Sequence, residues 1–427
     1  MDGIESKSTA LTDWTPRQVR SIVERMGETG QPPERGALLV NVGTDDVLEV
    51  LRQEYLIPIR EDGRNSSFKL VQATFGGGKT HFLHCLREIS WAEGFIVSLV
   101  GISPKECPFD DTLLVYQAVA KNLELPPLET GKPPTRGVEM VLIRLLQAKI
   151  AESGEDAVRQ WLRMEFKRSQ IESHALRRAV WLFLEAVLDG DDEKEELLTA
   201  YLRGDHVSAA ERGELRLREE LDSKSAFRFL RSLIQVMREL GVPGMVLLFD
   251  EMDRVMSLSV KRRKAIGDNL RQMIDHCGQA TLPALLWVYA VPPEFMTTVV
   301  PEYPALEQRL RGAGRFSLAS PLEPVIDLES MPMEPEQLFE RIGWKLLELF
   351  KKGRTEELDM DMQKTNVSTL ADHMGRNALE SGSRRIFVKR LVHMLHEQIH
   401  DQKLLSSSDL ENFEGFEDDM DGEEDIF

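Results

Sequence analysis

Continuous apolar runs alternate along this chain with segments whose apolar residues recur every three or four positions. The stretch at 68–72 is apolar and β-prone, and runs at 94–100, 245–249 and 284–291 predict buried strands, as in a parallel sheet. A fifth, shorter strand is predicted at 314–318. Because helical spacing fills the intervals between these runs, the pattern predicts an α/β fold with a parallel sheet.

The interval between the second and third predicted strands is unusually long. From 125 to 240 the chain reads as almost wholly helical, with apolar stripes that we interpret as helix-packing core. A helical insertion of this length also offers a surface for a partner. Nearer the other end, a proline-rich linker at 321–335 precedes three predicted helices.

A phosphate-binding pattern follows the first predicted strand. The stretch from Ala73 to Thr80 reads A-x-x-x-x-G-K-T, a P-loop (Walker A) with alanine at its first position. Glycines let the backbone fold around an anion, and the helix that begins near Lys79 adds the positive end of its dipole. Lys79 is expected to reach the β- and γ-phosphates of ATP, and the Thr80 hydroxyl to ligate Mg²⁺. The predicted nucleotide-binding residues are Ala73, Thr74, Phe75, Gly76, Gly77, Gly78, Lys79, Thr80 and His81.

Two carboxylates end the third predicted strand. Asp250 and Glu251 form a Walker B pattern there, at the end of a parallel strand where doubly wound sheets bind their ligands. Asp250 is expected to hold Mg²⁺, and Glu251 to orient and polarise the water that attacks the γ-phosphate. Asp253 and Arg254 follow, either as a further part of the site or as the solvated start of a helix.

Three arginines are candidates for stabilising negative charge on the phosphates. Arg309 and Arg311 precede the last predicted strand, where arginines can enter a neighbouring subunit's site; ordinary surface arginines are the alternative. Arg385 opens the last predicted helix, from which it would reach the phosphates when a helical lid closes. Tyr289 is the polar residue near the end of the fourth strand that would have to sense the γ-phosphate.

Charge is distributed unevenly along the chain. The formal net charge is −19, and ten acidic residues with no basic one lie between Asp409 and Asp425. Without those ten charges the net is −9, which argues against a generally DNA-coating surface. The densest basic cluster lies in a predicted helix and is interpreted either as a solvated face or as a contact with DNA or an acidic partner. It consists of Lys261, Arg262, Arg263 and Lys264.

Cellular location is predicted from three further features. Cys85, Cys107 and Cys277 are far apart and have no metal-binding spacing, which predicts reduced thiols. The apolar runs are too short to span a membrane, and the first residues lack the basic and apolar regions of a signal peptide. These features predict a cytoplasmic protein without a membrane partner.

Several local stretches together resemble the ATP-binding protein of bacteriophage-exclusion (BREX) systems. They are 31–36, 75–83, 248–251 and 385–387, and the resemblance extends over about 35–400. It implies an AAA+ P-loop ATPase, a three-layer α/β sandwich with a parallel sheet, a large helical insertion and a C-terminal helical lid. It also implies a role in bacterial anti-phage defence, with other subunits of a defence operon as partners. Ala73, Tyr289 and the acidic tail depart from the family pattern.

Two functions are consistent with these features. The leading hypothesis is a Mg²⁺-dependent ATP hydrolase that couples its nucleotide state to homo-oligomer assembly, or to remodelling of a partner protein or DNA. The alternative is a non-hydrolysing, nucleotide-dependent scaffold that recruits defence effectors; a kinase would need an acceptor pocket and is disfavoured. The predicted regions are a helical arm at 1–37, an ATPase core at 38–325 with the insertion at about 125–240, a lid at 326–404 and an acidic, disordered tail at 405–427.

Overall fold

The computed structural model describes residues 11–63, 66–103, 107–251, 258–279, 282–312, 314–330, 333–376, 382–406 and 409–410. Contacts divide the chain into two compact units. The first contains Asp46–Gln72 and Leu86–Asp327, and the second contains Lys7–Asp45, Ala73–Cys85 and Leu328–Phe427. Asp253, Arg254 and most of the acidic tail lie outside the described residues.

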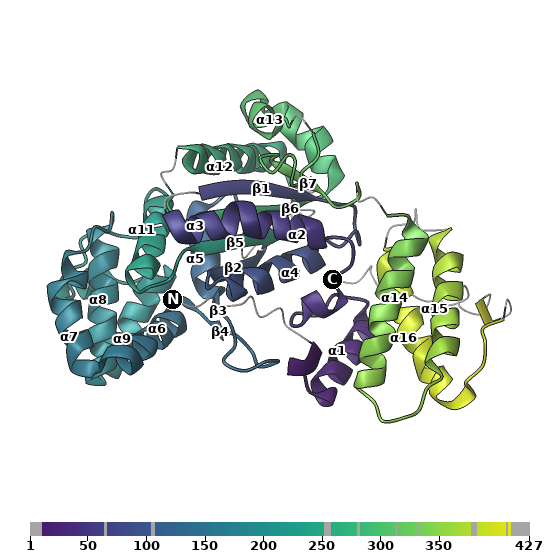
Figure 1. Ribbon diagram of the computed structural model, residues 1–427. Coiled ribbons are helices and arrows are strands. Elements are labelled where there is room, and N and C mark those ends of the chain that lie inside the picture. Colours follow the sequence, from purple (N-terminus) through teal and green to yellow (C-terminus); the bar gives the residue numbers. More distant parts are fainter. Residues whose placement is uncertain are drawn as a thin grey trace. The chain divides into compact units, whose positions relative to one another are not determined.

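A seven-stranded sheet with the order β4-β3-β2-β5-β6-β1-β7 occupies the first unit (Figure 1). The five strands from β2 to β7 in this order are parallel, whereas β3 and β4 are antiparallel additions at one edge. The four long predicted strands are confirmed. The strands are β1 (Ser66–Gln72), β2 (Ile96–Gly101), β3 (Leu123–Leu125), β4 (Thr135–Arg136), β5 (Met245–Asp250), β6 (Leu285–Val291) and β7 (Val325–Asp327).

The strand predicted at 314–318 was wrong. That stretch contributes only an isolated bridge between Ser317 and Ser320, and the edge strand is β7, which pairs with the end of β1. The preceding proline contributes to this pairing, because the Leu70 N–H donates to the carbonyl of Pro324. A proline at the start of an edge strand loses no ladder hydrogen bond, so the proline-rich segment tolerates a strand there.

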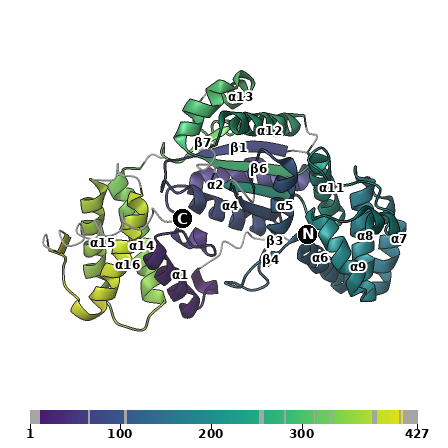
Figure 2. The same ribbon diagram turned by 180° about the vertical axis from the view of Figure 1, so that it is seen from behind.

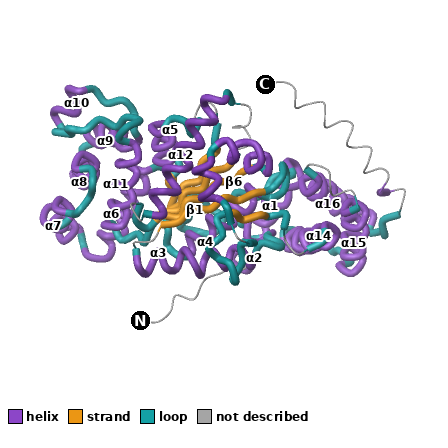
Figure 3. Tube along the Cα trace, turned by 90° about the horizontal axis from the view of Figure 1, so that it is seen from above, coloured by secondary structure: helices purple, strands orange, loops and turns teal. Residues whose placement is uncertain are grey.

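Helices α6 to α11 follow β3 and β4 in the interval between β2 and β5. Helices α6 to α9 gather into one bundle beside the β3–β4 edge (Figures 1 and 3). Ser173 caps α8 through the Leu176 N–H, and Gly190 ends that helix in a left-handed conformation. The helices are α6 (Val138–Ser153), α7 (Glu155–Met164), η4 (Phe166–Arg168), α8 (His174–Asp189), α9 (Asp192–Arg203), α10 (Ala209–Glu214) and α11 (Ala226–Glu239).

The remaining helices between residues 45 and 310 lie before, between or after the sheet strands along the chain. The α5 helix begins after Asp111, whose carboxylate accepts from the Leu113 N–H. The helix α4 starts in the second unit and continues into the first. The bounds are α2 (Asp45–Leu51), α3 (Ile57–Asp62), α4 (Lys79–Ala92), α5 (Thr112–Lys121), α12 (Val260–Gly278) and α13 (Pro304–Leu310).

The second unit is a helical assembly in which α1 (Pro16–Thr29) packs against α14 (Pro335–Lys352) and α16 (Ser383–Asp401) (Figure 2). Its fourth long helix, α15 (Met360–Gly375), packs against α14. Thr15 and Gln18 form a capping box at the start of α1, and Pro16 occupies the first position of the helix. A methyl group added at Gly27 would lie 2.4 Å from Cγ1 of Val392, so α1 and α16 need a glycine to approach this closely.

Candidate functional site

The glycine turn of the P-loop lies wholly in the second unit. Gly76 and Gly78 have φ values of +76° and +96°, which favour glycine, while Ala73 lies outside the left-handed region as expected. A Cβ added at Gly76 would lie 2.7 Å from the Cα of Gly382. A Cβ at Gly77 would lie 2.8 Å from the Cβ of Ala73, so the alanine at the first position makes this glycine necessary. The turn is therefore shaped to wrap backbone around an anion.

Lys79 begins α4 directly after this turn. Its side chain is buried, and Nζ donates to the carbonyl oxygens of Ala73 (2.9 Å) and Thr74 (3.1 Å). The ammonium group therefore already lies over the loop that the P-loop pattern assigns to phosphate. Thr80 and His81 occupy the next positions of the helix, within its first turn, where backbone N–H groups and the helix dipole favour an anion.

Arg384, which sequence reasoning missed, lies against the glycine turn. Its Nη1 donates to the carbonyl oxygen of Gly77 and would lie 2.9 Å from a Cβ added at Gly78. Burial lowers the pKa of Arg384, and the nearby carboxylate of Glu329 opposes that shift. Arg385, the residue we expected to reach the phosphates, instead places its guanidinium 4.7 Å from the ring centroid of Phe75. The adjacent arginines were the available signal, but the sequence does not show which one faces the turn.

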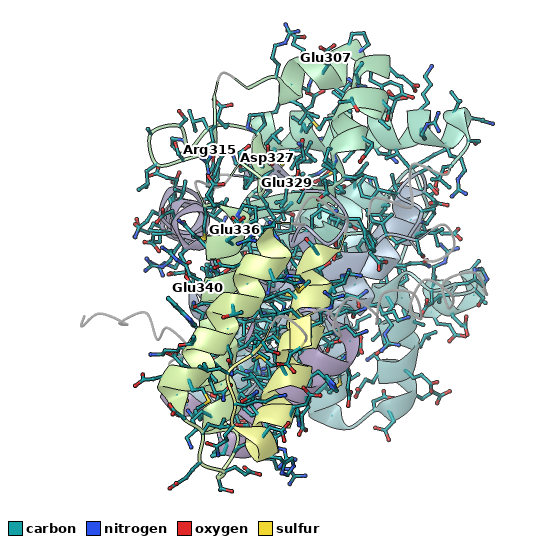
Figure 4. All side chains as sticks on the ribbon, turned by 90° about the vertical axis from the view of Figure 1, so that its right-hand side faces the viewer. Glu307, Arg315, Asp327, Glu329, Glu336 and Glu340 are labelled. Carbon is teal, nitrogen blue, oxygen red and sulfur yellow. The ribbon has the colours of Figure 1, made fainter. Side chains whose placement is uncertain are left out.

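Glu329 is a second residue that the sequence did not indicate. Its Oε1 accepts from the Thr74 N–H (2.8 Å) and from the Thr74 hydroxyl, so a carboxylate binds the backbone of the P-loop. Glu329 is labelled in Figure 4, together with Glu336 and Glu340, which lie one turn apart on α14. It falls in the segment that sequence reasoning assigned to a linker.

The first turns of α4 also contact the segment that precedes α2. The ring Nδ1 of His84 lies 3.0 Å from the carbonyl oxygen of Pro33, and Cys85 lies near the side chain of Asn41. Burial, with the positive charges of His84, Arg384 and Lys345, lowers the pKa of His81 to about 3. The ring of His81 is therefore neutral at physiological pH.

The predicted carboxylate pair lies in the first unit, at the end of β5. Every residue of β5 is buried, and Asp250 Oδ1 accepts from the Glu251 N–H (2.9 Å). Glu251 is exposed and has φ of +62°, a strained conformation for glutamate that costs on the order of 1–2 kcal/mol. A methyl group added at Gly101, the end of β2, would lie 3.3 Å from Glu251 Oε2. The side chain is therefore directed along the ends of the strands.

The sheet register tests whether these carboxylates lie at the expected edge. Gly101 pairs with Asp250, Phe249 pairs with Tyr289, and Gln72 pairs with Val291. Because these strands are parallel, the carboxyl ends of β1, β2, β5 and β6 lie at one edge of the sheet. The chain leaves that edge at Gln72 and continues directly into Ala73.

The side chain of Tyr289 belongs to the interior of β6 and not to the edge where the strands end. Its ring packs among Phe249, Phe109 and Trp287, with centroid distances of 4.8, 4.9 and 5.7 Å. It is fully buried, which raises its pKa well above the ordinary value, and its hydroxyl has no hydrogen-bond partner in the described part of the chain. The tyrosine is therefore a core residue in an aromatic cluster.

The other predicted cationic side chains differ in the hydrogen bonds and ion pairs that they form. Arg309 donates to Asp275 and to the Ala305 carbonyl (2.7 Å). Arg311 is 78% exposed, and among the described residues its side chain forms a single long contact of 3.4 Å, with Glu307. In the basic cluster, Arg262 forms a bidentate pair with Asp110 and Arg263 donates to the Leu258 carbonyl. The remaining two members, Lys261 and Lys264, are exposed.

Comparisons with known proteins give one finding. The family described as "BREX system ATP-binding protein BrxC/D" matches residues 15–412. Searches of curated proteins and of solved structures find no match. Separately, no helix in the described ranges is both long and apolar enough to cross a bilayer.

Proposed function

The chain belongs to the BREX system ATP-binding protein BrxC/D family, and from that premise we propose that it is a Mg²⁺-dependent AAA+ ATP hydrolase of anti-phage defence. One observation carries the proposal. β1 runs into the glycine turn and β5 runs into Asp250 and Glu251, and the two strands end at the same edge of the sheet. Ligands of parallel α/β sheets bind outside such an edge.

Each residue then has a defined role. The turn amides and Lys79 bind the phosphates, and the ammonium group exchanges the Ala73 and Thr74 carbonyls for phosphate oxygens. Bound Mg²⁺ neutralises phosphate charge, and Thr80 and Asp250 are the residues that would hold it. Glu251 orients the attacking water and accepts its proton.

Arginines complete the proposed machinery. The contact of Arg384 with Gly77 favours Arg384 as the lid residue that binds phosphate, and leaves Arg385 to hold the Phe75 ring. In a nucleotide-dependent homo-oligomer, the exposed Arg311 is the better candidate to enter a neighbouring site, because Arg309 is already paired with Asp275. Exposed Lys261 and Lys264 are the residues through which we propose contact with DNA or an acidic defence subunit.

Replacing Glu251 tests hydrolysis. Glu251→Gln is expected to keep ATP affinity and to lower turnover about 10²- to 10⁴-fold, because the amide accepts no proton from water. ATP turnover would be measured alone, with a DNA series and with operon partners. The control is Glu239→Gln, an exposed carboxylate at the end of α11. Wild-type protein without turnover under all these conditions would contradict the proposal.

A nucleotide-dependent scaffold is the second candidate. The enclosure of Tyr289 supports it, because β6 then offers no hydroxyl at its end to sense the γ-phosphate. Mass photometry with and without ATP separates the two functions. Assembly that depends on ATP but is the same in wild type and Glu251→Gln, with no turnover in either, would favour the scaffold.

A further inference from the structure

The helical insertion contains a cavity of about 420 Å³ whose lining is strongly cationic. We call it the insertion cavity. It lies between η4, α8 and the segment that follows α10, so residues about fifty positions apart meet there. Five cationic side chains and one carboxylate, Glu219, line it. The cations are Lys167, Arg177, Arg178, Arg216 and Arg218.

None of the five cations forms an ion pair with a described residue. The carboxylate of Glu219 is already engaged, since it accepts from the Ser173 hydroxyl (2.8 Å) and pairs with Arg228 (3.1 Å). Five positive charges beside a single carboxylate repel one another, and the whole chain is strongly acidic. The cluster therefore favours the binding of an anion from outside the cavity.

Three of the five cations are held in place before any ligand arrives. Arg177 donates to the Ser169 carbonyl and Arg178 to the Leu215 carbonyl, each at 2.7 Å. The Lys167 ammonium lies 4.4 Å from the centroid of the Trp181 ring. These contacts use backbone oxygens and a ring face, so the positive charges stay unneutralised. Fixed donors of this kind lower the entropy lost when a ligand binds.

Arg216 adds strain to the same site. Its φ is +54°, a region that residues other than glycine and asparagine rarely occupy. The turn that imposes this conformation is closed by hydrogen bonds from the Arg216 N–H to Gly213 and from the Leu217 N–H to Arg212. A glycine would remove the strain but also the guanidinium. Strained residues of this kind gather at ligand-binding sites.

We propose that the insertion cavity binds the phosphate groups of a ligand of nucleotide size. A cavity of this volume is in the range of small-ligand pockets. Compact phosphates suit it better than carboxylates, because each phosphate monoester carries nearly two charges and matches guanidinium geometry. The same chemistry is presented by a free nucleotide and by the 5′-phosphorylated end of a nucleic-acid strand. The site is independent of the P-loop.

Binding is tested on the full chain carrying Lys79→Ala, which weakens the P-loop site. The probes are inorganic tripolyphosphate, GTP, and a short oligonucleotide with a 5′-phosphate or a 5′-hydroxyl, titrated calorimetrically at low salt. The double variant Lys167→Glu with Arg218→Glu changes two exposed side chains and is expected to weaken binding at least about tenfold. Arg168→Glu, an exposed neighbour that does not line the cavity, should change affinity less than about twofold.

The probes distinguish a free nucleotide from the phosphorylated end of a strand as the source of the phosphate groups. Loss of tripolyphosphate and GTP binding in the double variant supports a free nucleotide, while loss confined to the 5′-phosphorylated strand supports a strand end. The proposal is overturned if no probe binds, if Arg168→Glu weakens binding equally, or if the strand binds irrespective of its 5′-phosphate. The proposal is also overturned if a peptide of residues 409–427 binds more tightly than every phosphate probe and if this binding is lost in the double variant. Lys167→Gln with Arg218→Gln should reproduce the loss, and circular dichroism checks that both variants fold.

Discussion

The two cationic regions that we propose to bind anions are built in different ways. The glycine turn uses backbone N–H groups, one lysine that begins a helix and left-handed glycines within eight consecutive residues. The insertion cavity uses side chains from η4, α8 and the segment after α10, held by backbone carbonyls and a tryptophan ring. The first is a local device and the second is assembled by helix packing.

The difference shows which mutations each region tolerates. A backbone device fails when its conformation changes, so its glycines matter as much as its lysine. A side-chain device depends on the number and placement of charges, so single conservative changes have modest effects and charge reversal has large ones. Four predictions test this contrast.

The largest effect is expected from Gly76→Val. The φ of +76° and the Gly382 Cα at 2.7 Å from an added Cβ leave no room for a branched side chain. ATP affinity should fall at least about a hundredfold, corresponding to roughly 3 kcal/mol. Phosphate binding in the insertion cavity should not change. The control is Gly213→Val, because nothing lies within 4 Å of a Cβ at that position. Equal losses of ATP affinity in both variants would show that the conformation of the glycine turn is not what binds ATP.

Removing Arg384 should weaken ATP binding about tenfold or more, because a charged donor to phosphate is lost. Arg385→Ala is the matched control and should have an effect of about twofold, since its guanidinium contacts the Phe75 ring. Titration with a fluorescent ATP analogue measures both. The reverse order of effects would restore Arg385 as the phosphate-binding residue.

The helix that follows the glycine turn should also respond to acid. Burial is the main reason that the pKa of His81 in α4 is lowered to about 3. In the unfolded chain the pKa of His81 is about 6.5. Below that pH the unfolded chain takes up a proton at His81 that the folded chain does not, so the free energy of unfolding falls as pH decreases. Between pH 7.5 and 5.5, His81 should cost about 1.4 kcal/mol of unfolding free energy.

Urea unfolding at the two pH values measures this loss in wild type and in His81→Gln. The variant lacks the titrating ring and should lose less stability on acidification by about that amount. Identical pH dependence in wild type and His81→Gln would show that His81 titrates normally.

The smallest effect is expected from Glu329→Gln. The carboxylate binds the Thr74 N–H, and its negative charge opposes a phosphate at the same turn. The variant should bind ATP about threefold more tightly, whereas Glu348→Gln, an exposed position on α14, should not. Weaker binding in Glu329→Gln would mean that the carboxylate supports the loop in its binding conformation.

Much of the sheet followed from the sequence, because a strand buried on both faces must be apolar throughout. The runs that became β5 and β6 are of this kind. The Asp111 cap and the Thr15 capping box likewise depend only on neighbouring residues. The edge strand β7 was missed, because three residues between prolines carry no periodicity. Its position depends on pairing with β1.

The sequence alone determined the glycine turn that we propose to bind phosphate, and the order of the motifs, since eight neighbouring residues contain all the chemistry that the turn requires. Only the tertiary structure decided that Arg384 faces Gly77, that Glu329 binds Thr74 and that Tyr289 is enclosed by aromatic rings. It also decided that Lys167 and Arg218 line one cavity. The physical reason is that these contacts join residues far apart in sequence, where helix rotation and packing, and not local conformational preference, choose the partner.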